Sequence, residues 1–409
     1  MTYTTPVPNT TEPIADWATD FDILDPAYVV HPEQRWAEQR ERCPIAFTER
    51  RQRTWLPVRY DDLAAIAHDV ERFSSRDIAV ISPFQHLGDG APSLTAPPIT
   101  SDPPLHTWAR RLLLPAFGPS AIDRMTPITR DRARNLIEEH FAQGHGDAAG
   151  DYARHIPVRI IALMLGVPIE DEGLFTGWVV RILQEGLQNI DKTMDSLGEI
   201  IAYFVEKVAE RRAVPEGERP DDLLTMLIET ETEEEMTDEH LVGTCFLLLV
   251  AGIDTTWSSI ASSLWHLATH PGDQARLRED PSLMPMAVEE FLRVYSPVTM
   301  ARYVTEDVEV SGCPMKAGDK VLMAFPAGNH DPEMFERADE FVIDREHNRH
   351  FAFGSGIHRC LGSNLARMEL RVAIETFLEK VPTFTLSDPG AVVWTGGQVR
   401  GPRCVPITF

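Results

Sequence analysis

Cysteine is scarce in this chain, and the few cysteines form no recognisable pattern. They stand at Cys43, Cys245, Cys313, Cys360 and Cys404 in a sequence of 409 residues. Their number is odd and their spacing matches no zinc motif, which argues against a disulfide framework and a structural zinc site. We therefore expect a chain that works in a reducing compartment, with four of the five cysteines buried as small apolar residues. Only Cys360 has neighbours that point to chemistry.

Positive charge is also in short supply. The chain has 38 Lys and Arg against 63 Asp and Glu, which gives a formal charge of -25. An acidic surface repels phosphate backbones and anionic lipids, so we expect neither a nucleic acid nor a membrane as partner. The apolar run at residues 246–251 is far too short to cross a bilayer. Residues 1–13 lack the basic start and the apolar stretch of a signal peptide, and we expect the protein in the cytoplasm.

The rest of the composition is that of a globular protein, with 43% hydrophobic and 25% charged residues. We predict a flexible N-terminal arm over residues 1–14 and a single domain over residues 15–409. Residues 81–104 are rich in Pro and Gly and predict a long loop, which in a folded domain is usually functional or disordered. Residues 105–269 are strongly helical in pattern, and the last third mixes short strands with helices. The fold class that follows is mainly α with small β-sheets.

One predicted helix is much longer than the others. Thr237 is a suitable N-cap, and Asp238 and Glu239 follow in the first turn, where the helix dipole favours anions. The apolar pattern then continues until it stops before Pro271. Roughly 34 residues at 1.5 Å each give a helix of about 50 Å, long enough to cross a domain of this size. A helix that is apolar nearly all round belongs in a core, so polar residues in its middle need a reason.

Residues 353–362, Phe-Gly-Ser-Gly-Ile-His-Arg-Cys-Leu-Gly, are the most informative stretch of the chain. The glycines allow the backbone to approach a flat ligand closely. We expect Cys360 to open a helix over residues 361–379, where the dipole and the free N–H groups stabilise a thiolate. Taken alone, the same cysteine could be an inert residue beside a turn.

This stretch resembles the haem-binding signature of the cytochromes P450, Phe-x-x-Gly-x-x-x-Cys-x-Gly, at every fixed position. The resemblance covers the chain from about residue 20 to its end. It implies the cytochrome P450 fold, in which a long central helix lies over haem b (iron protoporphyrin IX). It also implies that Cys360 is the metal ligand, with Phe353, Gly354 and Gly362 beside the cofactor. The activity implied is that of a monooxygenase, which inserts one oxygen atom from O2 into an organic substrate.

Four basic residues match the positions that the family uses to bind the haem propionates. They are His106, Arg110, Arg302 and His358. His106 and Arg110 are one helical turn apart, so both can face the same anion. Each residue taken alone could be an ordinary surface charge, but the four together favour a site, because carboxylates inside a pocket need cations.

Glu290 and Arg293 stand three residues apart in a helical stretch, so they share one face and can pair. In isolation such a pair contributes only about 0.2–0.5 kcal/mol. Here the two residues resemble the Glu-x-x-Arg of the family, and Arg345 matches its partner arginine. The role implied is structural, because the three residues fix the segment that leads to Cys360.

The middle of the long helix reads Ala251-Gly252-Ile253-Asp254-Thr255. Ala251 and Gly252 have little or no side chain where a porphyrin would press against the helix. Asp254 and Thr255 put an acid and an alcohol where burial and helix propensity disfavour both. They resemble the acid–alcohol pair with which the family relays protons to bound dioxygen. A threonine bonded back to a helical carbonyl is a structural alternative.

The resemblance also implies partners. We expect two electrons from a separate ferredoxin with its ferredoxin reductase, because no residues remain for a flavin or iron–sulfur domain. Arg111, Arg349 and Arg359 could form a basic docking patch on the thiolate face, or they could be unrelated surface charges. We expect the protein to be a monomer.

A small or medium hydrophobic substrate fits the apolar character of the expected pocket, with hydroxylation or O-dealkylation as the reaction. Terpene, aromatic, fatty-acid and macrolide substrates all remain open. The expected pocket residues are Phe84, Leu94, Leu248, Ala251, Val298, Gln398 and Val399. Two other functions also remain open at this point: a haem-thiolate isomerase or dehydratase, and a non-catalytic docking module with the same fold.

Overall fold

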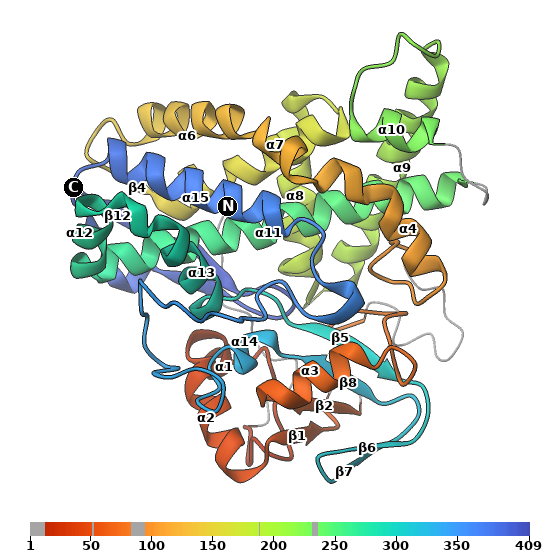
Figure 1. Cartoon of the computed structure of the whole chain (residues 1–409), viewed down its shortest axis with the longest axis vertical. Coiled ribbons are helices and arrows are strands. Elements are labelled where there is room, and N and C mark those ends of the chain that lie inside the picture. The colour runs from red at the N-terminus through yellow and green to blue at the C-terminus, as the bar shows by residue number, and fades with distance from the viewer. Residues whose placement is uncertain (1–12, 51–52, 83–94, 188, 231–235) are drawn as a thin grey trace.

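The computed structural model describes residues 13–50, 53–82, 95–187, 189–230 and 236–409. Helices fill the upper part of Figure 1, and many of the strands gather in the lower part with the short helices of residues 26–68. The predicted fold class, mainly α with small β-sheets, is confirmed. The predicted arm over residues 1–14 falls largely outside the described residues, as do the pocket candidates Phe84 and Leu94.

The α-helices are numbered along the chain. They are α1 (Pro26–Val30), α2 (Pro32–Arg42), α3 (Tyr60–His68), α4 (Leu105–Leu113), α5 (Pro119–Asp123), α6 (Thr126–His140), α7 (His155–Leu165), α8 (Glu172–Leu183), α9 (Ile190–Ala213), α10 (Leu223–Glu229), α11 (Asp238–Thr269), α12 (Pro271–Glu279), α13 (Met284–Val294), α14 (Phe325–Gly328) and α15 (Ser363–Lys380). Short 3-10 turns include η5 (Glu185–Leu187) and η7 (Gly356–His358).

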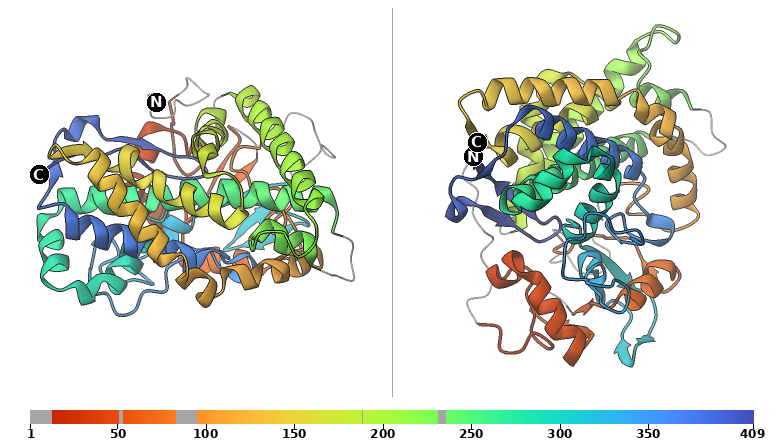
Figure 2. Two further views of the ribbon diagram at one scale, coloured as in Figure 1. Left: turned by 90° about the horizontal axis from the view of Figure 1, so that it is seen from above. Right: turned by 60° about the vertical axis from the view of Figure 1, so that its left-hand side comes forward.

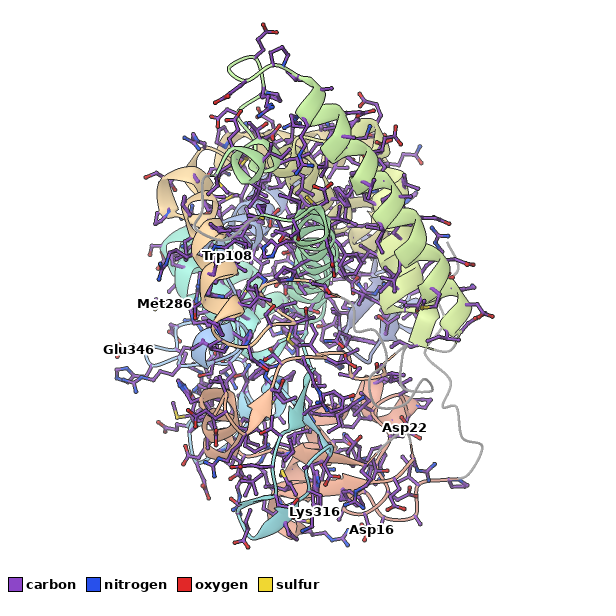
Figure 3. All side chains as sticks on the ribbon, turned by 90° about the vertical axis from the view of Figure 1, so that its right-hand side faces the viewer. Asp16, Asp22, Trp108, Met286, Lys316 and Glu346 are labelled. Atoms are coloured by element: carbon purple, nitrogen blue, oxygen red, sulfur yellow. The ribbon has the colours of Figure 1, made fainter. Side chains whose placement is uncertain are left out.

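The long central helix is α11, and its predicted ends are confirmed. Thr237 is the N-cap, with its side-chain oxygen accepting a hydrogen bond from the N–H of His240 at 3.2 Å. The helix runs for 32 residues and ends at Thr269, before Pro271. It passes through the middle of the molecule in Figure 2, and Figure 3 looks nearly along it, with the labelled Trp108 of α4 to one side.

Among the described helices, α11 is the one long and apolar enough to cross a membrane. However, 67% of its most apolar window is buried inside the protein, as expected of a core helix. Its C-terminal half packs Trp257 and Leu264 into a cluster with Phe377 of α15. Its N-terminal half packs Leu249 into a second cluster with Ile161 of α7. The middle of α11 therefore lies between two apolar clusters, which fix its position.

The strands form small sheets. They are β1 (Ile45–Thr48), β2 (Thr54–Pro57), β3 (Phe73–Ser74), β4 (His145–Asp147), β5 (Met300–Val304), β6 (Val308–Val310), β7 (Cys313–Met315), β8 (Lys320–Met323), β9 (Thr385–Leu386), β10 (Val393–Thr395), β11 (Gly401–Cys404) and β12 (Pro406–Thr408). The largest sheet has the order β1-β2-β8-β5-β3, with β2 and β8 parallel and the other neighbours antiparallel. Smaller sheets join β10 to β11, β6 to β7, and β4 to β12 and β9.

The expectation that four cysteines are buried is wrong for three of them. Cys245 is fully buried in α11, but Cys43, Cys313 and Cys404 are partly exposed. Cys43 caps the end of α2, where its Sγ donates to the carbonyl of Ile45, and the other two lie on strands of two-stranded sheets. A side chain at a helix end or on a two-stranded sheet has fewer neighbouring elements to cover it, so it stays partly exposed.

Candidate active site

A cavity lies between the middle of α11 and the loop that carries Cys360, with about 1350 Å³ of empty space including its mouth. This cavity brings together most of the residues singled out from the sequence. Those on its wall are Arg110, Leu248, Ala251, Gly252, Thr255, Val298, Arg302, Phe353, Gly354, His358, Cys360 and Gly362. Two predicted residues, His106 and Asp254, are buried behind the wall.

The loop from Phe353 to Gly362 needs glycine at two of its positions. Gly354 and Gly356 have φ angles of 66° and 70°, in the left-handed region that other residues rarely adopt. A Cβ on Gly356 would also lie 2.3 Å from the carbonyl oxygen of Ala67 in α3. The N–H of Cys360 donates to the carbonyl of Phe353 at 2.8 Å, which closes the loop on itself. Glycine therefore allows the loop to press against α3 and place Cys360 on the cavity wall.

The expectation that Cys360 opens a helix is wrong by two residues, because the helix expected to start at residue 361 begins at Ser363. The residues between the two form a turn, so the sulfur lies outside the first helical turn, where the dipole acts. Burial raises the pKa of the Cys360 thiol, and the backbone N–H of Gly362 and the guanidinium of Arg110 oppose that rise. Local hydrogen bonding and nearby cations thus offset part of the cost of burying a thiolate at this position.

Four basic residues surround the side of the cavity next to α4. Arg302 is buried, and burial lowers its pKa to about 10. Its guanidinium donates to the carbonyl of Ala301, and no described carboxylate lies within ion-pair distance of it. Arg110 donates to the carbonyl of Arg359 and is likewise without a carboxylate partner among the described residues. Two cations on one cavity wall are costly unless an anion joins them.

The two histidines complete this basic group. Their ring centroids lie 4.3 Å apart, with His106 behind His358. Burial lowers the pKa of both rings, and the guanidiniums of Arg302 and Arg110 lower the pKa of both further; for His358 the result is about 2. Both imidazoles are therefore neutral at ordinary pH, so they can donate one hydrogen bond each without adding charge. His358 already contacts the hydroxyl of Ser75 at 2.9 Å.

Glu290, Arg293 and Arg345 meet as a buried cluster on α13. The side chains of Glu290 and Arg293 are fully buried and pair at 2.8 Å, and Arg345 Nε reaches Glu290 at 3.0 Å. Arg293 also donates to the carbonyls of Asn329, Ala338 and Glu340. The cluster therefore ties α13 to the irregular segment 329–348, which continues directly into the Cys360 loop.

The polar residues of α11 point in different directions. Thr255 is on the cavity wall, and its hydroxyl donates to the carbonyl of Ala251 at 2.8 Å. This is the back-bonding geometry that also remained open from the sequence, and α11 is a regular α-helix through it. Asp254 is completely buried on another side, paired with Arg403 of β11 at 3.0 Å. The acid and the alcohol are adjacent in sequence, but only the alcohol meets the cavity.

Gly252 has a second structural role besides the expected one on the cavity wall. A Cβ at this position would lie 2.4 Å from Cδ1 of Ile161 in α7. The missing side chain therefore lets α11 approach α7, in addition to leaving the cavity wall flat. Ala251, by contrast, is exposed to the cavity as expected.

A second, apolar cavity adjoins the first and shares Ala251, Thr255 and Val298 with it. Gln398 and Val399, predicted from the sequence, line this second cavity, whereas Leu248 lines only the first. Sequence reasoning missed the wall formed by the end of α8, η5 and the start of α9. Its members are Ile182, Leu183, Gly186, Leu187, Ile190, Thr193 and Leu197. Their apolar spacing is the same as that of ordinary core residues, so the sequence had no signal to separate them.

The chain is similar in sequence to proteins of one known family. The family model "Cytochrome P450" matches residues 177–390 of the chain. The cytochrome P450 monooxygenase PikC of Streptomyces venezuelae is 32% identical over 400 residues, which are 95% of this chain and 94% of PikC. The chain belongs to the cytochrome P450 family.

Solved cytochrome P450 structures share the fold. The LnmA cytochrome P450 hydroxylase from the leinamycin biosynthetic pathway of Streptomyces atroolivaceus is 36% identical, with a TM-score of 0.79 over 93% of this chain and 96% of LnmA. CYP109E1 from Bacillus megaterium, solved in complex with testosterone, is 30% identical, with a TM-score of 0.82 over 92% of this chain and 97% of CYP109E1.

This cytochrome P450 is a monooxygenase, and its cofactor is haem, iron protoporphyrin IX. The residues around the first cavity fit that group. A cysteine sulfur on the wall suits iron, and two guanidiniums without carboxylate partners suit the two propionates. As a member of the family, the enzyme depends on a redox partner for electrons and acts on hydrophobic substrates.

Proposed function

We propose that Cys360 is the thiolate ligand of the haem iron and that Arg110, Arg302, His106 and His358 bind the propionates. The observation that carries this proposal is the presence of the sulfur and both unpaired guanidiniums around one cavity. Phe353, Gly354 and Gly362 then form the wall beside the thiolate, and Ala251 and Gly252 form the opposite wall. When bound, the haem supplies the oxygen-activating chemistry, and the protein supplies position and electrostatics.

Thr255 and Asp254 are the proposed proton-handling residues. Thr255 Oγ1 is on the wall shared by the two cavities, so it can hold a proton where substrate and dioxygen meet. Asp254 lies one residue earlier on α11 and can supply that proton as a buried acid. The proposed reaction is hydroxylation or O-dealkylation of a substrate held in the second cavity.

The second cavity favours a neutral, mainly aliphatic substrate of small or medium size. Its walls are almost entirely apolar, with Phe246 and Leu187 among them. The charged residues on the wall, Arg76 and Asp77, are consecutive and of opposite sign, so they add no net charge. Testosterone, which occupies the related CYP109E1, is a substance of this kind.

An optical titration of the purified haem protein with terpenes, steroids, aromatics and fatty acids tests this assignment. We expect a saturable shift from low to high spin with neutral polycyclic or terpenoid compounds. The variant Leu187→Trp should weaken their binding by about tenfold, because overpacking a filled cavity costs roughly 1–3 kcal/mol. Leu174→Trp, on the exposed part of α8, is the matched control and should bind as the natural protein does. Equal affinity in both variants would contradict the assignment of the second cavity.

The proposed electron donor is a ferredoxin served by a ferredoxin reductase. Arg349 and Arg359 line one shallow hollow on the surface next to the Cys360 loop, and Arg111 is exposed on α4, which bonds to that loop through Arg110. These three residues form a basic patch on a chain whose formal charge is -25. An acidic ferredoxin would be steered to such a patch and away from the remaining surface.

Charge reversal tests the basic patch. Each of Arg111→Glu, Arg349→Glu and Arg359→Glu should slow reduction by an acidic ferredoxin by about tenfold at low salt, with the difference shrinking as salt rises. Arg212→Glu on α9, away from the hollow, is the control and should leave the rate unchanged. Stopped-flow reduction of variants that keep the natural absorption spectrum provides the measurement. Unchanged rates in all three variants would rule the patch out.

The proposal also includes a monomeric protein in the cytoplasm, with residues 15–409 as one domain. The support is compositional: an acidic surface, unpaired cysteines and a long apolar helix buried by its own chain.

A further inference from the structure

The carboxylate of Asp254 is held by a second part of the chain. Arg403 of β11 contacts both of its oxygens at 3.0 Å, in a two-pronged pair. Gln184, just after α8, donates to Oδ1 at the longer distance of 3.4 Å. The side chains of Asp254 and Arg403 are both completely buried. This acid therefore has one strong partner and one weak one.

Arg403 itself has little freedom to move. Its Nε donates to Oγ1 of Thr395 at 2.8 Å, and Nη1 donates to Oγ of Ser258 at 3.1 Å. Its guanidinium also lies 4.5 Å from the ring of Trp257. The guanidinium is thus held by Thr395 of β10 and by Ser258 and Asp254 of α11.

The approach of β11 to α11 makes this contact possible. A Cβ on Gly401 would lie 2.5 Å from Cβ of Ser258, so the strand can pack against the helix only with glycine here. Gly401 pairs with Thr395 across the β10–β11 sheet, which carries Thr395 to the guanidinium. Two residues further along β11, Arg403 enters the core opposite Asp254.

Stability alone is a poor explanation for this pair. Replacing a buried ion pair with apolar residues of similar volume is often neutral or stabilising, because desolvation offsets the attraction. Asp254, the acid of this pair, is the residue next to Thr255, in the middle of the helix that forms the cavity wall. Among the described residues, Arg403 is the charged group that acts on Asp254, and Gln184 is neutral. Burial raises the pKa of Asp254, and Arg403 opposes that rise.

We propose that Arg403 is the positioning residue for Asp254: it holds the carboxylate turned away from the cavity and favours its charged form, so that the acid can release a proton toward Thr255 and take one up again. This inference rests on the proposed proton-handling role of Asp254. Without Arg403 the carboxylate would keep only Gln184, and a buried acid with no cation takes up a proton. A neutral Asp254 no longer cycles between its charged and protonated forms at working pH.

The first test uses infrared spectroscopy and needs no turnover. We expect the carbonyl band of a buried, protonated carboxylic acid in Arg403→Leu but not in the natural protein. The band should weaken as pH is raised through the pKa, and it should be absent from the double variant Arg403→Leu/Asp254→Asn. Arg403→Lys keeps the positive charge and should remove most of the band.

The second test measures coupling. Uncoupled turnover diverts two electrons and two protons to dioxygen and releases hydrogen peroxide in place of product. The ratio of peroxide to product should rise several-fold in Asp254→Asn and in Arg403→Leu, and Arg403→Lys should restore much of the coupling. Arg400→Leu is the matched control: this arginine lies just before β11 and donates to the carbonyls of Val29 and Val30, away from the acid. It should leave both the ratio and the infrared spectrum unchanged.

The outcomes distinguish failure of the inference about Arg403 from failure of the proposed role of Asp254. If Asp254→Asn is as well coupled as the natural protein, the proposed role of Asp254 fails. If Asp254→Asn uncouples but Arg403→Leu neither uncouples nor shows the acid band, Arg403 is a structural residue and the inference is overturned. Should Arg403→Leu fail to fold, Arg403→Lys and Arg403→Gln carry the same comparison, with only the glutamine variant expected to show the band.

Discussion

Replacing Cys360 with serine is expected to lower monooxygenase turnover by more than about 100-fold, because even the outer partners of a metal ligand contribute 10–100-fold. A serine hydroxyl does not ionise at working pH, so it cannot donate electron density as the thiolate does. The reduced, carbon monoxide-bound absorption spectrum typical of haem-thiolate proteins should disappear as well. Purified protein, assayed with a chemical reductant and carbon monoxide, gives the spectrum, and turnover with a ferredoxin system gives the rate.

Two further variants sharpen this experiment. Cys360→His offers a nitrogen ligand in place of sulfur, so it should retain haem while showing the spectrum of nitrogen ligation, which separates loss of the thiolate from loss of the cofactor. Cys313→Ser, on the β6–β7 hairpin and not among the cavity residues, makes the same atomic change elsewhere and should leave the spectrum intact. A thiolate spectrum that survives in Cys360→Ser would show that another residue binds the iron.

The buried cluster on α13 is expected to give the largest effect on stability. Glu290→Gln removes one negative charge from a site where two guanidiniums meet, Arg293 and Arg345. Removing one partner of a buried ion pair typically costs about 3–5 kcal/mol, because the other charge stays buried and uncompensated. The free energy of unfolding should fall by that amount in guanidinium chloride titrations. Because the cluster holds segment 329–348, haem retention should fall with it.

The chain supplies a closely matched control for this change. Glu340 pairs with Arg337 at the same three-residue spacing, but both side chains are more than half exposed. Glu340→Gln therefore makes the same substitution in the same kind of pair, and we expect no measurable change in stability. If the two variants are equally stable, the cluster on α13 does not hold the segment that leads to Cys360.

The sequence predicts the parts of this fold that depend on local signals. Thr237 and Pro271 mark the ends of α11 because a cap and a helix breaker act within a few residues. The Cys360 loop is recognisable for the same reason, since its glycines serve turns and close approaches inside one short segment. Even there, α15 begins at Ser363, two residues after the predicted start, because a turn and a first helical turn have similar sequence requirements.

Other parts depend on contacts between distant residues, and the sequence carries no local sign of them. Arg403 lies 149 residues from Asp254 along the chain, in a short strand that would suit an edge as well as a core. The wall from Ile182 to Leu197 shows only apolar spacing, which core helices share. The cysteines show the same limit, because residue type sets only a preference for burial, and the place of each residue in the fold, at a helix end or on a strand, decides its exposure.

The pairing of β4 with β12 has a consequence for how this chain reaches its native state. The contact beside it, from the N–H of Val405 to Asp147, joins residues 258 positions apart, and β2 pairs in parallel with β8, where Thr54 lies opposite the similarly distant Lys320. Closing loops of that length costs conformational entropy before any pairing energy is gained. Chains rich in such non-local pairings fold slowly, whereas helices form from local contacts. We therefore expect the helices to appear early in refolding, and the strand pairs that join distant segments, together with the non-local Arg403–Asp254 contact, to form last.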